Sequence, residues 1–109
     1  MREYDPTQFQ GGWFMGDFEP SLLKTPGFEV GVKKHKAHEY HEPHYHEIAT
    51  EYNYLLEGTL IINEHRFVAP TIFVVEPGEV VYPYFETDCT LCIIKVPSVP
   101  GDKYIVENK

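Results

Sequence analysis

Residues 44–58, HYHEIATEYNYLLEG, contain the most informative pattern in the chain. Two histidines stand one residue apart at His44 and His46, Glu51 follows after four further residues, and Gly58 ends the stretch. Alternate side chains of a β-strand lie on one face, so the two imidazoles should point the same way. Two imidazoles and a carboxylate suit Zn, Fe, Mn, Ni or Co better than Mg or Ca. The alternative is a solvated strand with chance histidines, but the glutamate and the glycine favour a metal site.

The spacing of these four residues resembles the first motif of the cupin superfamily: His-x-His, three or four residues, Glu, six residues, Gly. The glycine that usually stands six positions before the first histidine is His38 here. The second cupin motif is a Pro-Gly turn followed by a third histidine. Residues 76–78, Glu-Pro-Gly, resemble that turn, but Val81 occupies the histidine position and Tyr82 follows. The resemblance covers residues 28–96 and implies an all-β fold, the double-stranded β-helix or jelly-roll barrel.

Composition limits the classes of protein that the chain can represent. Its 109 residues suit a single domain, and 42% hydrophobic with 15% aromatic residues is enough for an ordered core. The formal net charge of -8 argues against binding to nucleic acid or to anionic membranes, which reward clustered Lys and Arg. There is no apolar run long enough for a transmembrane helix, and no apolar segment follows Arg2 as in a secretory signal. We therefore expect a cytoplasmic protein.

Two regions are expected within the single domain. Residues 1–27 lack a clean periodicity and should form an irregular arm, whose aromatic side chains pack on the body or which adds a strand to a partner. Residues 28–109 should form the barrel, because about seven to nine short strands alternate with turns at Gly and Pro. One expected hairpin spans residues 59–68 and turns at Asn63-Glu64.

The strand that follows the histidines should have two distinct faces. If Glu51 points into the barrel, Asn53 and Leu55 do so too, by the two-residue period. The opposite face then holds three large side chains: Tyr52, Tyr54 and Leu56. Together with the aromatic cluster at residues 13–18, this is more apolar surface than a small monomer usually exposes, so we expect a homodimer.

Three further residues are candidates for contacts to a ligand or to a metal-bound water: Tyr82, His41 and Asn53. Tyr82 follows the position of the absent third histidine and could replace it. His41 belongs, with His35 and His38, to a segment that we expect to be loop or surface, because a proline and aromatic neighbours argue against a helix there. A histidine in a loop can still reach a metal.

The segment CTLCIIKV, residues 89–96, is aliphatic and β-branched and predicts a strand. Cys89 and Cys92 are three residues apart, so their sulfurs should face opposite sides, and we interpret them as ordinary thiols rather than a redox pair or half a zinc site. Lys95 could point into the barrel mouth, but a solvated position at the strand end is the interpretation that we favour.

Two functions fit these observations. In the first, the protein is a metal-dependent enzyme of the isomerase or oxygenase type that acts on a small polar molecule. In the second, it binds a small ligand, such as a sugar or an acid, without turnover and with no metal or a structural one. An open coordination position indicates the first function, since structural sites are closed by protein ligands.

Overall fold

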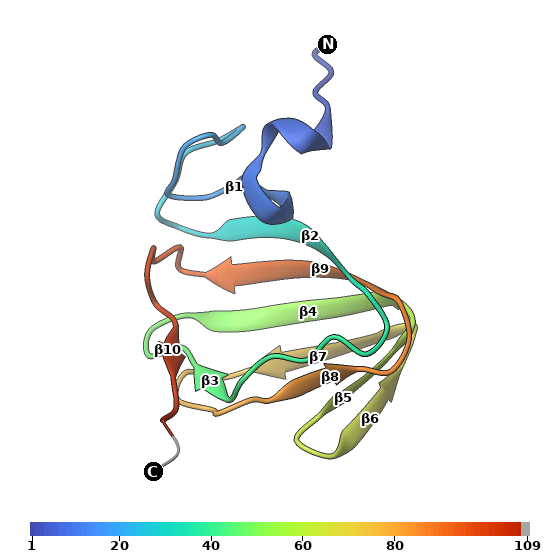
Figure 1. The fold of residues 1–109 in the computed structure, drawn as a ribbon. Coiled ribbons are helices and arrows are strands. Elements are labelled where there is room, and N and C mark those ends of the chain that lie inside the picture. Colours follow the sequence, from blue (N-terminus) through green and yellow to red (C-terminus); the bar gives the residue numbers. More distant parts are fainter. Residues whose placement is uncertain (108–109) are drawn as a thin grey trace.

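A computed structural model describes residues 1–107 and consists almost entirely of β-strands (Figure 1). The final two residues of the expected 28–109 domain lie outside the described part. Two short 3₁₀ turns and ten strands follow one another: η1 (Pro6–Gln8), η2 (Gln10–Gly12), β1 (Trp13–Met15), β2 (Glu29–His35), β3 (His44–Tyr45), β4 (Thr50–Glu57), β5 (Thr59–Ile62), β6 (His65–Val68), β7 (Thr71–Val75), β8 (Pro83–Phe85), β9 (Cys89–Val96) and β10 (Tyr104–Ile105). The predicted all-β class is confirmed. Within residues 1–107, neither helical turn has the length or the hydropathy to cross a membrane.

The strands form one large sheet and two small ones that face it. The large sheet has the order β1-β2-β9-β4-β7, and the small sheets are β6-β5-β8 and β10-β3. All of the named pairs are antiparallel, and Asn53 of β4 lies between Phe73 of β7 and Ile93 of β9. In Figure 1, β3 and β8 pass in front of the large sheet. The result is a flattened barrel whose interior is lined by both layers.

The apolar core fills the space between β4, β5, β8 and β9. Its buried members are Leu55, Leu60, Phe85, Cys89, Leu91 and Ile93. Leu55 is 0% exposed, and burial of a leucine of this kind contributes about 1.5–3 kcal/mol. Because Leu55 points inward, Glu51 and Asn53 do so too, as the two-residue period predicted. The core therefore fixes the direction in which two candidate site residues point.

The predicted hairpin at Asn63-Glu64 is confirmed. Asn63 and Glu64 have φ of 52° and 70°, the left-handed conformation that a two-residue type I′ turn requires at both positions. The Asn63 amide also joins the turn to the segment before β8. Its Nδ2 donates to the Val80 carbonyl at 2.8 Å, and its Oδ1 accepts from the Tyr82 N–H at 2.9 Å. These bonds compensate for a glutamate at a position that usually favours glycine.

The polar face of strand β2 lies inside the barrel. Val32 is 38% exposed, whereas Gly31 is buried and Lys33 and His35 line the interior. The prediction that His35 lies in a loop or on the surface is therefore wrong, because His35 is the last residue of β2. Polar side chains of β2 point inward because part of the cavity wall is polar, whereas the outer face of the large sheet is apolar.

The N-terminal arm is less irregular than expected. Residues 13–15 form β1, which pairs with β2 and extends the large sheet. Trp13 packs on the body of the domain as predicted, over Gly31, where a Cβ atom would come within 2.7 Å of the indole. Only glycine leaves room for this contact, so the sequence at position 31 determines where the tryptophan lies.

The outer face of the large sheet carries many exposed apolar side chains. They include Tyr52, Tyr54, Leu56, Ile72, Val74 and Ile94. The predicted division of β4 into two faces is thus confirmed. Cys89 is buried in the core, Cys92 is only partly buried, and both are free thiols on opposite faces of β9.

Candidate functional site

A cavity of about 270 Å³ lies between the two layers of the barrel. One part of its wall is apolar and is formed by Leu60, Ile62, Phe73, Val75, Leu91 and Ile93. The other part is polar and contains four histidines, three lysines, Glu51 and Asn53. An apolar wall combined with convergent polar groups is the usual composition of a small-molecule site.

Four of the six histidines form a continuous row along this wall. The ring centroids of His35 and His41 are 5.2 Å apart, those of His41 and His44 are 6.4 Å apart, and those of His44 and His46 are 6.1 Å apart. The sequence pattern identified the inner end of the row. It missed His35, because the interior direction of β2 could not be deduced from hydrophobic alternation.

The inner set consists of His44, His46 and Glu51. Each imidazole is held through Nδ1 by a backbone carbonyl: His44 donates to Glu42 at 2.8 Å, and His46 donates to Asp102. This arrangement directs Nε2 of each ring away from the backbone. Histidines that bind metals usually make such a bond with the other ring nitrogen, which fixes the ring orientation.

Glu51 joins this set from β4. Its Oε2 lies 3.1 Å from His46 Nε2, and its Oε1 accepts from Asn53 Nδ2 at 3.1 Å. Burial acts to raise the pKa of Glu51, but the hydrogen bond from His46, the charge of Lys95 and the bond from Asn53 together lower it. Because both ring nitrogens of His46 face acceptors, its protonated form pairs with the Glu51 carboxylate.

The two histidines of the inner set differ in their acidity. The hydrogen bond to Glu51 raises the pKa of His46 above its usual 6.5. Burial is the main cause that lowers the pKa of His44 below the same value. At neutral pH, His44 therefore presents an unprotonated Nε2, whereas a metal at His46 has to displace a proton.

Asp102 supports the inner set from the other end of the chain. Its buried carboxylate accepts hydrogen bonds from the backbone N–H groups of Glu47, Ile48 and Ala49 at 2.9, 3.1 and 2.9 Å. Its carbonyl accepts the bond from His46. Asp102 thus fixes the turn that leads from His46 into β4. Nothing in the local sequence indicated this role, since the contacts span more than fifty positions.

An outer set, His35, Glu39 and His41, lies at the other end of the row. Within residues 1–107 it is the one group of three potential ligands whose ligand atoms all lie within 4.8 Å of one another. Glu39 Oε2 lies 2.9 Å from His41 Nε2 and 2.5 Å from His35 Nδ1. The hydrogen bond from His41 is the main cause that lowers the pKa of Glu39 to about 2. The inner set places its three ligand atoms farther apart.

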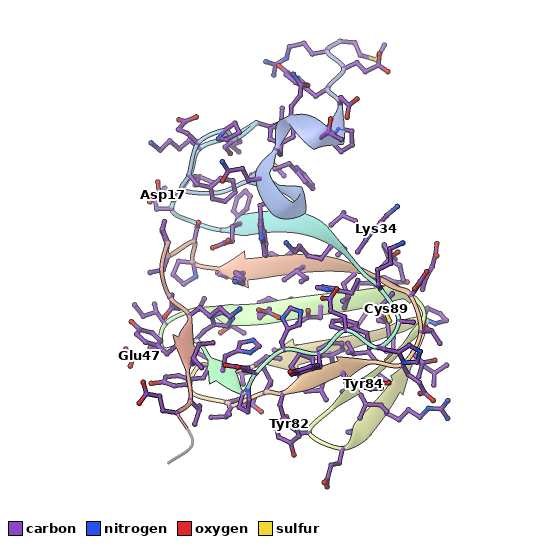
Figure 2. The ribbon with its side chains drawn as sticks, viewed as in Figure 1. Asp17, Lys34, Glu47, Tyr82, Tyr84 and Cys89 are labelled. Atoms are coloured by element: carbon purple, nitrogen blue, oxygen red, sulfur yellow. The ribbon has the colours of Figure 1, made fainter. Side chains whose placement is uncertain are left out.

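Of the three other predicted site residues, two line the cavity and one points away from it. Asn53 lies in the cavity wall and contacts Glu51, and His41 also lines the cavity. Tyr82 does not, because Val81 and Pro83 face the interior and the residue between them points outward. Figure 2 shows Tyr82 projecting from the lower edge of the barrel, and it is 44% exposed.

Lysines make up the other part of the polar wall. Lys95 faces the cavity rather than solvent, so the interpretation favoured from the sequence is wrong. Lys33 and Lys103 also line the cavity and were not predicted. Lys95 belongs to the inward alternation of β9, together with Leu91 and Ile93, which the sequence alone could have suggested.

Neither a protein-family model nor a curated protein sequence matches this chain. Many solved structures match its fold. One is an uncharacterized conserved protein with a double-stranded beta-helix domain from Klebsiella pneumoniae, with TM-score 0.69, 17% identity and coverage of 80% of this chain and 76% of that one. A sugar phosphate isomerase from a cupin superfamily, from Silicibacter pomeroyi, has TM-score 0.64, 16% identity and coverage of 80% and 60%. A recombinant oxalate oxidase in complex with glycolate has TM-score 0.65, 17% identity and coverage of 94% and 59%.

These similarities establish the fold as the cupin-type double-stranded β-helix. The matched part amounts to about three fifths of the isomerase and of the oxidase. The fold is compatible with many unrelated activities, so function has to be argued from the site.

Proposed function

We propose that the protein binds a divalent transition metal through His44, His46 and Glu51 and acts on a small polar molecule in the barrel. The reaction class that we favour is isomerisation or oxygenation. The similarity in fold to a sugar phosphate isomerase and to an oxalate oxidase supports this choice.

The main support is the way in which the two imidazoles are held. Both use Nδ1 to donate to a backbone carbonyl, which leaves Nε2 as the ligand atom of each ring. Two imidazoles and a carboxylate, with further positions left for water or substrate, suit first-row transition metals. The donor set therefore fits the metal.

A bound metal would supply Lewis-acid polarisation of a substrate oxygen. The chain's own residues perform the other tasks. Asn53 holds the Glu51 carboxylate in place through its 3.1 Å hydrogen bond. The apolar wall excludes water around the ligand, which strengthens electrostatic contacts inside the cavity. His41, the next imidazole in the row, also lines the cavity and would face part of a bound ligand.

The test is metal analysis of protein purified without a polyhistidine tag. We expect a near-stoichiometric first-row metal in the wild type and its loss in His44→Ala. Glu51→Gln should weaken binding about 10–100-fold, because an amide is a poorer ligand of the same shape. His65→Gln, which changes an exposed histidine on β6, is the matched control and should retain the metal. Absence of metal, with no thermal shift on adding Fe, Mn, Ni, Co or Zn, would refute the proposal.

The second candidate function is binding of a small ligand without a metal or turnover. Two observations favour it: Val81 occupies the position of the third histidine, and His46 already has partners on both ring nitrogens. In the described part of the chain, no buried side-chain nitrogen or oxygen lacks a hydrogen-bond partner. Ligand binding that survives metal removal and the His44→Ala change would support this alternative.

We also propose that the protein forms a homodimer through the outer face of the large sheet. Ile72 at 65% exposure and Tyr52 at 44% are large apolar side chains on an uncovered face. Light scattering at tens of micromolar should give twice the chain mass of 12.7 kDa. A monomer mass would contradict this proposal and leave the site unaffected.

A further inference from the structure

The cavity contains more positive charge than the protein as a whole. Three lysines line it, Lys33, Lys95 and Lys103, whereas Glu51 is the one carboxylate among its lining residues within residues 1–107. The whole chain has nine Lys and Arg against seventeen Asp and Glu. A third of the basic side chains of an acidic protein thus converge on one cavity.

Two of these lysines are held by the same aromatic ring. The ammonium of Lys33 lies 5.5 Å from the Trp13 ring centroid, and that of Lys95 lies 5.0 Å from it. Lys33 also donates to the Gly11 carbonyl. Cation–π contacts of this kind orient an ammonium without neutralising its charge. Because the packing over Gly31 fixes Trp13, both ammonium groups are held beside the same indole at the cavity wall.

In the described part of the chain, none of these three ammonium groups lies within 4.0 Å of a carboxylate oxygen. Within residues 1–107, the ion pairs of lysine and arginine join Lys24 to Glu19 and Arg66 to Glu86. Glu29, which is opposite Lys95 in the register of β2 and β9, accepts a hydrogen bond from Ser98.

Glu51, opposite Lys95 in the register of β4 and β9, is a nearby source of negative charge, and the charge of Lys95 helps to lower its pKa. One carboxylate that also pairs with His46 leaves the three lysines with a surplus of positive charge. Burial, followed by the charges of Lys95 and Lys103, lowers the pKa of Lys33, whereas Glu39 acts in the opposite direction. Like charges gathered in a partly buried site are unfavourable unless an anion neutralises them.

We propose that the cavity binds a small organic anion, whose carboxylate or phosphate group contacts Lys33, Lys95 and Lys103. The remainder of the ligand then extends along the apolar wall towards His44 and Glu51. A cavity of about 270 Å³ is near the lower end of the usual range for ligand sites, which indicates a small metabolite. The proposal names the ligand class for the site of the proposed function and rests on that site, but it does not require the metal.

The test is an NMR titration of ¹⁵N-labelled, EDTA-treated protein at low salt. The probes are succinate, inorganic phosphate and succinamide, the neutral diamide of succinate. We expect succinate, phosphate or both to shift the backbone resonances of Gly31, Lys33 and Lys95, with succinamide at least about tenfold weaker. Added salt should weaken anion binding. The preferred probe distinguishes a carboxylate ligand from a phosphate ligand.

Matched lysine variants locate the site. Lys33→Gln and Lys95→Gln should each weaken anion binding about tenfold, because each removes a charged donor. Lys34→Gln should not, since Lys34 is exposed and, as Figure 2 shows, points outward from the end of β2. The wild-type pattern of resonances in each variant shows that it is folded.

Three results would overturn the proposal. They are equal binding of succinate and succinamide, no binding of either anion, and unchanged anion affinity in both Lys33→Gln and Lys95→Gln. Repetition after loading with Zn²⁺ separates this proposal from the metal proposal. If the protein takes up no metal but still binds the anion, the metal function is refuted and the anion site stands. If the protein takes up metal but binds neither anion, the anion site is refuted and the metal function stands.

Discussion

The two ends of the histidine row contain the same side-chain types in different arrangements. In the outer set, both imidazoles contact the same oxygen of Glu39, whose side chain is 38% exposed. In the inner set, both imidazoles donate to backbone carbonyls, and Glu51 contacts only one of them. The outer set is therefore closed on itself, whereas the inner set has a ligand atom of each ring directed away from the backbone. Proximity of potential ligands is a weaker indication of a metal site than the bonds that orient them.

The largest expected effect is a fall in the free energy of unfolding when Asp102 is replaced. Asp102 contacts the inner set and not the outer one. Asp102→Ala removes three backbone hydrogen bonds to one buried carboxylate, so we expect the free energy of unfolding to fall by about 3 kcal/mol. Glu39→Ala, the matched change at the outer set, should cost less than about 1 kcal/mol because the side chain is 38% exposed. Chemical denaturation of both variants measures the difference. Equal losses would show that the two ends are supported equally.

The second effect concerns the titration of the inner histidines. We expect NMR titration to give a pKa above 6.5 for His46 and below 6.5 for His44. Glu51→Gln should lower the pKa of His46, since it removes the charged acceptor that raises it. The pKa of His44 should change much less. Similar pKa values for the two imidazoles would contradict the arrangement of the inner set.

The same pair gives stability a defined pH dependence. The raised pKa of His46 means that its contribution is complete below 6.5 and is lost as pH rises through the folded value. The lowered pKa of Glu51 means that its contribution is present above 4.5 and is lost as pH falls through the folded value. The pair therefore stabilises the protein most between these limits. Denaturation of the wild type and Glu51→Gln across pH should differ most in that window.

A smaller effect is expected at the outer set. The pKa of Glu39 is lowered from 4.5 to about 2, so its contribution to stability is present above 4.5 and declines as pH falls towards 2. Solvent screening limits this contribution to less than about 1 kcal/mol. ¹³C NMR of the carboxyl group measures the pKa directly. His41→Ala should raise that pKa, because His41 makes the hydrogen bond with the largest effect. An unchanged value would contradict the geometry of the outer set.

The smallest effect is expected at Tyr82, which the sequence suggested as a substitute for the missing third histidine. Because this side chain points away from the cavity, Tyr82→Phe should change metal or anion affinity by less than about 0.5 kcal/mol. Isothermal titration calorimetry with the probes above measures the change. A loss of tenfold or more would mean that Tyr82 reaches the inner set.

The features that could be predicted from the sequence are those that depend on local periodicity. The two faces of β4 and the turn at Asn63-Glu64 follow from strand alternation and turn chemistry, and both were confirmed. The orientation of β2 was not predictable in this way. Its valines face outward and Lys33 faces inward, because the layer opposite β2 contributes histidines rather than a continuous apolar surface.

Long-range contacts account for the rest of the site. Asp102 reaches the turn after His46 from more than fifty residues away, and no spacing rule relates the two segments. Lys33 and Lys95 come together only because β2 and β9 are neighbours and Trp13 lies over Gly31. Knowledge of the strand order was therefore needed to recognise the cationic part of the wall.

The position of Trp13 also has a spectroscopic consequence. It is the single tryptophan of the chain, and its indole lies in the cavity wall next to two ammonium groups. Nearby charges shift the emission maximum of an indole, and displacement of water from its surroundings changes the intensity. The protein thus has an intrinsic fluorophore at its candidate binding site. Any molecule that enters the cavity and neutralises these lysines should change the emission spectrum of Trp13, so binding can be measured without an added label.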